Sequence, residues 1–157
     1  MNTQHKAELN HFFVTVFNNI LIWEEQTLAS CGAPGLSVKE FHVLEAIDRL
    51  QAKSKNTMTN VARALSISVG ALTTAINVLV RKGYVSRQQS QEDRRIINIF
   101  LTDKGLAANE LHHKFHEEMI EEVVSDLEGP QLDMLILSLK HLSRFFMNKM
   151  TTKTENE

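Results

Sequence analysis

Apolar residues recur at helical spacing along most of the chain, and polar residues fill the positions between them. Residues 5–29 hold a wide apolar stripe with a period of about 3.6, which is typical of an amphipathic helix. Ser37 and Glu40 form a capping-box pattern, so we expect a second helix to begin there and to continue to Leu50. Residues 102–127 and 130–150 repeat the helical spacing. The apolar stripe of the first of these is expected to consist of Leu106, Leu111, Phe115, Met119 and Val123.

The middle of the chain combines two short helices with a hairpin. Thr57 and Ser68 are suitable capping residues for two helical segments with a short connection, and Gly83 is suited to end the second. That second helix is expected to bury Val69, Leu72, Ile76 and Leu79. After Gly83 the period changes to about 2, which predicts strands over 84–89 and 96–101 around a charged loop. The predicted fold class is mainly α with a small β-hairpin wing, a winged helix-turn-helix between long N- and C-terminal helices.

Charge is unevenly distributed along the chain. Residues 57–105 hold seven basic and three acidic side chains, a net charge of +4 within a formal total of −2, so the remaining residues carry −6. A basic segment in an otherwise acidic protein is expected where only one face meets phosphates. A solvated basic surface would give the same average, so the choice between them depends on particular residues.

The outward face of the helix over 68–82 has the composition of a DNA-reading helix. Small residues at its start allow the backbone to approach base edges, and hydrogen-bonding side chains follow at helical spacing. No charged residue occurs from 69 to 80, whereas an ordinary solvated helix usually carries Glu and Lys. The predicted DNA-contacting residues of this helix are Ser68, Gly70, Ala71, Thr73, Thr74, Asn77 and Arg81.

The predicted hairpin tip carries two adjacent arginines. Arg94 and Arg95 suit a narrow minor groove, whose negative potential attracts guanidinium groups. Asp93 is placed to pair with one of them and to hold the tip in shape, which leaves the other for DNA. A charged tip that only maintains solubility is the alternative, and the preceding helix favours DNA binding.

Three runs of residues around the wing are specific enough to suggest a family. They read Gly-Tyr-Val at 83–85, Glu-Asp-Arg-Arg at 92–95 and Leu-Thr-Asp-Lys-Gly at 101–105. With the order of the elements, they closely resemble the MarR family of winged-helix repressors. The resemblance implies a single chain over 1–157, a DNA-binding module over 37–105, and dimerisation helices over 5–31 and 106–150. It also implies a homodimer on a double-stranded, pseudo-palindromic operator.

Within that family, three further segments resemble repressors of bacterial fatty-acid synthesis. They are residues 17–25, 39–42 and 111–116, while residues 51–55 depart from that subgroup. The narrower resemblance implies an acylated acyl carrier protein as a possible corepressor. We expect any effector to act where the dimerisation helices join the winged module, near Trp23, Phe41, His42 and Phe115.

Two histidines suggest an alternative signal. His112 and His116 lie four residues apart on one predicted helix, a spacing that suits two ligands of a single metal ion. Zinc-sensing members of the family resemble this arrangement, which implies Glu24 and His42 as further ligands. A solvated polar face is the simpler interpretation, because glutamates surround the pair at 110, 117, 118, 121 and 122. No cofactor is required by the sequence, and zinc is the possible one.

Other classes of protein find little support in the residues. The chain has no Gly-x-Ser-x-Gly, phosphate-binding glycine loop or Cys-x-x-Cys pattern, so we predict that it is not an enzyme. No apolar run reaches the roughly 18 residues of a membrane span. The single cysteine, Cys31, fits a reducing compartment, so a cytoplasmic location without membrane association is expected. A redox-sensing role for Cys31 and a helical interaction protein that does not bind DNA remain alternatives.

Overall fold

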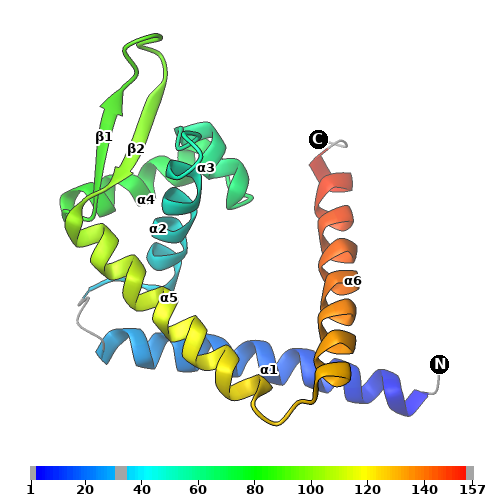
Figure 1. Ribbon diagram of the computed structural model, residues 1–157. Helices are drawn as coiled ribbons and strands as arrows, with labels where there is room; N and C mark the ends of the chain where they lie inside the picture. The colour runs from blue at the N-terminus through cyan, green and yellow to red at the C-terminus, as the bar shows by residue number, and fades with distance from the viewer. Residues whose placement is uncertain (1–2, 31–34, 155–157) are drawn as a thin grey trace. The chain divides into compact units, whose positions relative to one another are not determined.

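The computed structural model describes residues 3–30 and 35–154, and it is mainly helical (Figure 1). Within these residues the single sheet has two antiparallel strands, as the sequence predicts. Residues 1–116 and 117–157 form two compact units. The elements are α1 (Thr3–Ser30), α2 (Val38–Gln51), α3 (Met58–Ala64), α4 (Val69–Arg81), β1 (Val85–Gln89), β2 (Ile97–Leu101), α5 (Asp103–Val124) and α6 (Gly129–Thr154).

Helix α2 forms the centre of the first unit. Its N-terminus has the expected capping box, in which the Ser37 hydroxyl accepts the Glu40 N–H and the Glu40 carboxylate accepts the Ser37 N–H at 2.8 Å. Phe41, Leu44 and Ile47 are fully buried on one side of the helix. Because α2 contacts α1, α3, α4 and β2, it connects the N-terminal helix to the rest of this unit.

The helix pair α3–α4 has the two caps that the sequence predicts. The Thr57 hydroxyl accepts the Asn60 N–H, and the Ser68 hydroxyl accepts the Ala71 N–H. Leu72, Ile76 and Leu79 are completely buried, as expected. The prediction for Val69 is wrong, since 45% of its surface is exposed. Val69 is the first residue of α4 and lies beyond the core, where it faces the open surface beside the wing.

Gly83 ends α4 and turns the chain into the wing. Its φ of 79° is in the left-handed region, which favours glycine. The Gly83 N–H donates to the Val80 carbonyl and the Tyr84 N–H donates to the Leu79 carbonyl, the hydrogen-bond pattern of a Schellman motif. In the hairpin that follows, Val85 lies opposite Leu101. Each strand begins one residue later than predicted, at Val85 and at Ile97. Figure 1 shows them extending from the helices as a hairpin.

The start of α5 packs closely against the end of α4. The Thr102 hydroxyl donates to the Gly83 carbonyl at 2.7 Å and accepts the Gly105 N–H at 3.1 Å. Gly105 lies so close to the Tyr84 carbonyl oxygen that a Cβ atom there would overlap it. Residues 101–105 therefore join the wing to α5, and Gly105 allows the helix to approach the Tyr84 carbonyl closely.

The buried face of α5 differs from the predicted apolar stripe. Leu106 is 44% and Val123 is 65% exposed, so neither belongs to the buried face. The predicted helix is present, but it ends at Val124 rather than at Leu127. The glycine contact turns another face of the helix inward. That buried face consists of Gly105, Ala108, Asn109, His112 and Phe115.

Large apolar side chains remain exposed on α1 in the first unit and on α6 in the second. Leu9, Phe12 and Phe17 of α1 are each about half exposed. On α6, Leu139 is 52% and Phe146 is 49% exposed. Among the helices that the structure describes, none alone has the length and hydropathy of a membrane span; α3 and α4 together would, but they meet at a 105° bend.

Candidate DNA-binding surface and metal-ligand cluster

The predicted DNA-contacting face of α4 is open to solvent. Thr73 is half-buried, and the other six positions are exposed. Ser68 lies just before the helix and uses its hydroxyl as the N-cap. A Cβ atom added to Gly70 would have the Ser68 hydroxyl oxygen as its nearest neighbour among the described residues, at 3.9 Å, so the start of the helix is accessible to a ligand.

The two threonines of this face donate their hydroxyl protons to their own helix. Thr73 Oγ1 donates to the Val69 carbonyl at 2.7 Å, and Thr74 Oγ1 donates to the Gly70 carbonyl at 3.3 Å. Their oxygens can still accept, and their methyl groups are held in fixed positions. The Asn77 amide has no hydrogen-bond partner within the described part of the chain, so both its donor and its acceptor are available.

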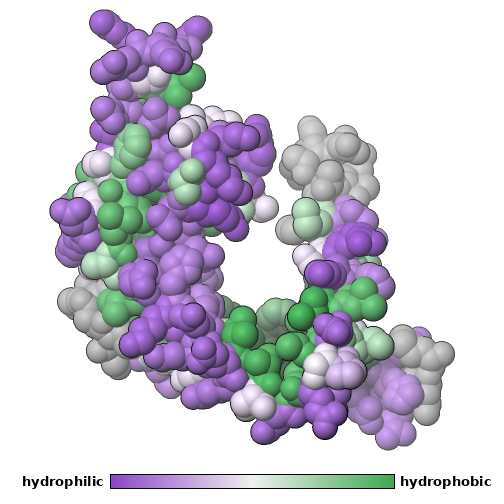
Figure 2. All heavy atoms as spheres, in the orientation of Figure 1, coloured by the Kyte–Doolittle hydropathy of each residue, from purple (hydrophilic) through white to green (hydrophobic). Residues whose placement is uncertain are grey.

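The tip of the wing has the expected carboxylate–arginine pair. Asp93 Oδ1 accepts the Arg95 backbone N–H at 2.9 Å and the Arg95 Nε–H at 3.2 Å. These two hydrogen bonds lower the pKa of Asp93 below its ordinary value. Arg95 still has 91% of its side chain exposed, and Arg94 is exposed beside it. Figure 2 shows hydrophilic residues covering the tip of the hairpin, at the top of the view.

Arg87 is a basic residue of this surface that the sequence analysis did not select. It lies on β1, and its Nη2 is 3.5 Å from the Thr73 carbonyl of α4. It lines a pocket of about 480 Å³ between α4 and the wing, together with Val69, Thr73, Ile96, Ile97, Arg95 and residues 57–59. Arg87 is exposed, although it shares a strand face with buried Val85 and lies opposite the fully buried Ile99 of β2. Its only signal in the sequence was its positive charge within the basic segment 57–105.

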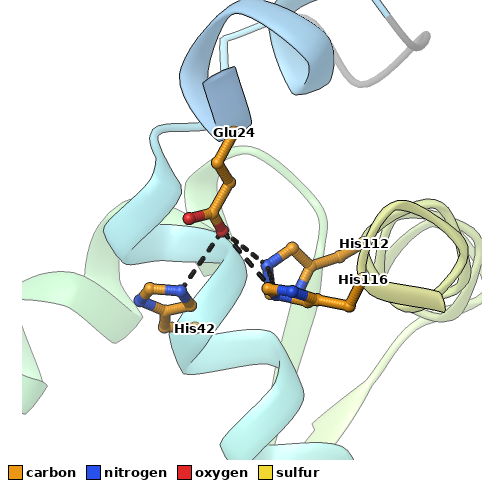
Figure 3. Close-up of side chains that lie close together, drawn as sticks. All are labelled: Glu24, His42, His112 and His116. Carbon is orange, nitrogen blue, oxygen red and sulfur yellow. Dashed lines mark hydrogen bonds and ion pairs between the residues drawn. The ribbon is translucent and has the colours of Figure 1, made fainter. Parts of the chain in front are cut away.

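A second group of residues lies where α1, α2 and α5 meet. Glu24 of α1 is surrounded by His42 of α2 and by His112 and His116 of α5 (Figure 3). Its Oε1 lies 2.8 Å from His112 Nε2, 3.3 Å from His42 Nε2 and 3.9 Å from His116 Nε2. His112 Nε2 and His116 Nε2 are 3.0 Å apart. The structure thus brings together all four residues that were predicted from the sequence as candidate ligands.

The simpler interpretation of these histidines as a solvated helix face is wrong. His112 is completely buried and Glu24 is 2% exposed, while His42 and His116 are half-buried. Burial lowers the pKa of His112 below its ordinary value, against the opposing effect of the hydrogen bond to Glu24. A histidine with a lowered pKa is neutral and has a ring nitrogen lone pair available for a ligand.

The geometry of the cluster fits a small cation. One ligand atom from each of the four residues lies within 4.8 Å of the others. A tetrahedral site with bonds of roughly 2.0 Å has ligand atoms about 3.3 Å apart, which is close to the separations in the cluster. Three imidazoles and one carboxylate are ligands that zinc accepts. His112 Nδ1 is also buried, and it has no hydrogen-bond partner among the residues that the structure describes.

Aromatic rings pack around the cluster. The Phe41 ring stacks on His112 with centroids 5.4 Å apart, and Phe115 lies 5.3 Å from His116. Trp23 contacts Phe115 at a centroid distance of 5.0 Å. Of the residues expected to line an effector site, His42 is therefore itself a candidate ligand, and the three aromatic residues pack around the cluster. Cys31, the candidate redox-sensing residue, lies outside the described residues.

Comparisons with known proteins agree with this arrangement of elements. A family model described as the MarR family matches residues 35–96. The HTH-type transcriptional regulator SarZ of Staphylococcus haemolyticus is 29% identical over 107 residues, which cover 68% of this chain and 69% of that protein. The crystal structure of Streptococcus pneumoniae FabT in complex with DNA is 30% identical, with a TM-score of 0.84, covering 91% of this chain and 98% of that one. A Staphylococcus aureus MepR–DNA complex shares the fold at 22% identity, with a TM-score of 0.72 and coverage of 87% and 95%.

Proposed function

The chain belongs to the MarR family of winged-helix, DNA-binding transcriptional regulators, and from this premise we propose that it is a homodimeric repressor whose operator binding responds to zinc. It is a transcriptional regulator rather than an enzyme, and a helical interaction protein that does not bind DNA is no longer an alternative. The observation that supports a zinc response is that Glu24, His42, His112 and His116 each place one ligand atom within 4.8 Å of the others. We place the activity in the cytoplasm, with the operator DNA.

The DNA contacts of the proposal come from α4 and the wing. The exposed face of α4 would enter the major groove, with Asn77 at base edges and Arg81 at a phosphate. Asp93 would hold Arg95, and the adjacent Arg94 would reach the minor groove. Arg87 lies between these two parts, where a phosphate backbone would pass. FabT and MepR, which share the fold, are both in complex with DNA in their structures.

The four candidate ligands would connect three helices. Glu24 comes from α1, His42 from α2 and the other two from α5, so their side chains meet only when these helices converge. Zinc would supply a closed, four-ligand attachment among them. A cation that binds the converged arrangement more tightly than other arrangements increases its population. Because α2 also contacts α4, this shift would affect the position of the DNA-reading helix.

The acylated carrier protein remains a second candidate signal. The sequence segments that resemble fatty-acid-synthesis repressors support it. Nothing among the described side chains points to an acyl group as specifically as Glu24 and its three histidines point to zinc. We therefore propose zinc first and use the acylated carrier protein as a second arm of the test.

The test measures binding to operator DNA selected by the purified protein from a random pool. Zinc is expected to tighten binding by roughly 5- to 150-fold relative to chelator, the usual range of coupling between two sites. The variant His116→Ala should lose this response. His113→Ala is the matched control, because His113 is the exposed neighbour of the cluster on the same helix, and it should keep the response.

Two results would contradict the proposal. If zinc and chelator give equal operator affinity while an acylated carrier protein tightens it, the signal is the acyl group. If His113→Ala and His116→Ala both respond as the wild type does, the cluster does not hold the metal that acts.

A further inference from the structure

The two ring nitrogens of His112 have different surroundings. Nε2 faces the cluster, 2.8 Å from Glu24 Oε1 and 3.0 Å from His116 Nε2. Nδ1 points away from it, is buried, and has no hydrogen-bond partner within the described residues. A carboxylate oxygen of Glu45 lies 3.9 Å from Nδ1, which is near but longer than a hydrogen bond.

The position of the proton explains this gap. When Nε2 of His112 carries the imidazole proton, it can donate to the Glu24 carboxylate oxygen 2.8 Å away. A neutral imidazole has one N–H, and Nδ1 is then a bare lone pair. A lone pair and the Glu45 carboxylate are both acceptors, and no hydrogen bond can form between them. The distance of 3.9 Å, longer than a hydrogen bond, agrees with this tautomer.

The opposite tautomer is required when His112 serves as a ligand. Nε2 must give up its proton to bind a cation, and a neutral ring then carries its only proton on Nδ1. One proton leaves Nε2 for solvent and one joins Nδ1, so the charge of the ring does not change. The new Nδ1–H is buried and needs an acceptor.

We propose that Glu45 is a positioning residue of the metal site, accepting the Nδ1–H of His112 when its Nε2 binds the cation. The inference rests on the proposed zinc response and adds a residue that contacts no cation itself. Glu45 and His42 are three residues apart on α2, so one turn of this helix would hold both a ligand and the support of another ligand. Ligating histidines commonly donate their second N–H to a carboxylate, which orients the ring.

Asn109 is the competing acceptor. Its Oδ1 is buried without a partner within the described residues, and it lies one turn before His112 on α5. Glu45 is favoured because an ionised oxygen is the stronger acceptor and adds a negative charge near the cation. Glu45 also belongs to a different helix, so its hydrogen bond would attach α2 to α5 at a second point.

The test measures the zinc dissociation constant of the full chain by competition with a chelating indicator. Glu45→Ala should weaken zinc binding by roughly 10- to 100-fold, the usual effect of losing such a support. Glu45→Gln removes the same charge but keeps an amide oxygen that can accept, so it should lose less. Asp48→Ala is the matched control, since it removes a carboxylate one turn further along α2, and it should bind zinc as the wild type does.

A second measurement follows the ring itself. Nitrogen-15 NMR of His112 should show the proton on Nε2 without zinc and on Nδ1 with zinc. In the zinc-loaded wild type the Nδ1–H should exchange slowly with solvent, and this protection should be lost in Glu45→Ala. A merely structural role of Glu45 in α2 would not change this signal.

The outcomes separate the inference from the proposed function. A wild-type protein that binds no zinc overturns both. Zinc binding that His116→Ala abolishes, but that Glu45→Ala and Glu45→Gln leave unchanged, overturns the role of Glu45 alone. If Asn109→Leu removes the protection and Glu45→Ala does not, the acceptor is Asn109 and the inference is wrong.

Discussion

Different residues of α4 are expected to have different roles in DNA binding, some at base edges and others at phosphates. The Thr73 and Thr74 hydroxyls donate to their own helix, so they offer an acceptor and a methyl group to DNA rather than a donor. Asn77 keeps a donor and an acceptor together, which is the pattern that reads an adenine edge. Arg81, in the last turn, offers a charge. These four side chains are therefore expected to differ in what they contribute to specificity.

Asn77→Ala is expected to relax base preference at one position of each half-site by roughly 1–3 kcal/mol. Arg81→Ala should weaken all DNA sequences alike and should lower the salt dependence of binding, because a phosphate contact carries no base information. Competition among single-base operator variants at several salt concentrations measures both effects. Arg144→Ala, which removes an exposed cation of α6, is the control. Unchanged binding by both α4 variants would exclude this face from the interface.

At the scale of elements, an ion pair attaches the start of α2 to the end of α4. Lys82 Nζ lies 2.6 Å from Glu40 Oε1 and also donates to the Gly35 carbonyl. Partial burial of Glu40 disfavours its charge, but hydrogen bonds from Lys82 and Ser37 outweigh this and lower its pKa below the ordinary value of 4.5. The pair links the helix that carries His42 to the DNA-reading helix.

The lowered pKa of Glu40 predicts a pH dependence of stability. The unfolded chain binds the proton more tightly than the folded chain, so the stabilisation is present above pH 4.5 and is lost as pH falls through the folded-state pKa. Lys82→Met should reduce the free energy of unfolding by about 1 kcal/mol at neutral pH and less under acid conditions. Urea unfolding between neutral and acid pH measures this difference. Lys39→Met, at an exposed neighbour on α2, should leave the curve unchanged; equal curves for all three proteins would contradict the role of the pair.

At the scale of the whole molecule, both α1 and α6 expose large apolar side chains. Leu9, Phe12 and Phe17 on α1, with Leu139 and Phe146 on α6, are each about half exposed. Large exposed apolar patches mark sites of association, and a second copy of the same chain buries them symmetrically. This supports the proposed homodimer through the two terminal helices.

Replacing Leu139 and Phe146 together with glutamate should convert the protein to a monomer in sedimentation experiments, because each new charge would be buried at the proposed interface. Operator affinity should fall by roughly 100-fold or more, since the two half-sites would no longer be bound together. Lys140→Glu, at an exposed position between them, is the control for added negative charge. A double variant that still sediments as a dimer would place the interface elsewhere.

Much of the fold could be predicted from the sequence because its signals are local. Ser37, Thr57 and Ser68 each cap a helix through a backbone N–H three residues away. Gly83 ends α4 by adopting a φ that other residues avoid, and the change of period after it predicts the hairpin. At the wing tip, Asp93 and Arg95 are two residues apart, so their pairing was also predictable. In each case the interacting groups are near neighbours in the chain.

Burial and the candidate metal cluster depended on contacts between distant residues. The sequence selected His112 and His116 by spacing, but their glutamate neighbours suggested a solvated face, and His112 is buried against a residue 88 positions away. The Gly105 contact with Tyr84 sets which side of α5 faces inward, and this turned Leu106 outward. The exposure of Val69 also depends on where the core ends rather than on its neighbours in the chain. The sequence by itself determined the helices, their caps and the hairpin, because these depend on periodicity and on hydrogen bonds between near neighbours. Only the tertiary structure decided which faces are buried, because burial depends on what packs against each helix.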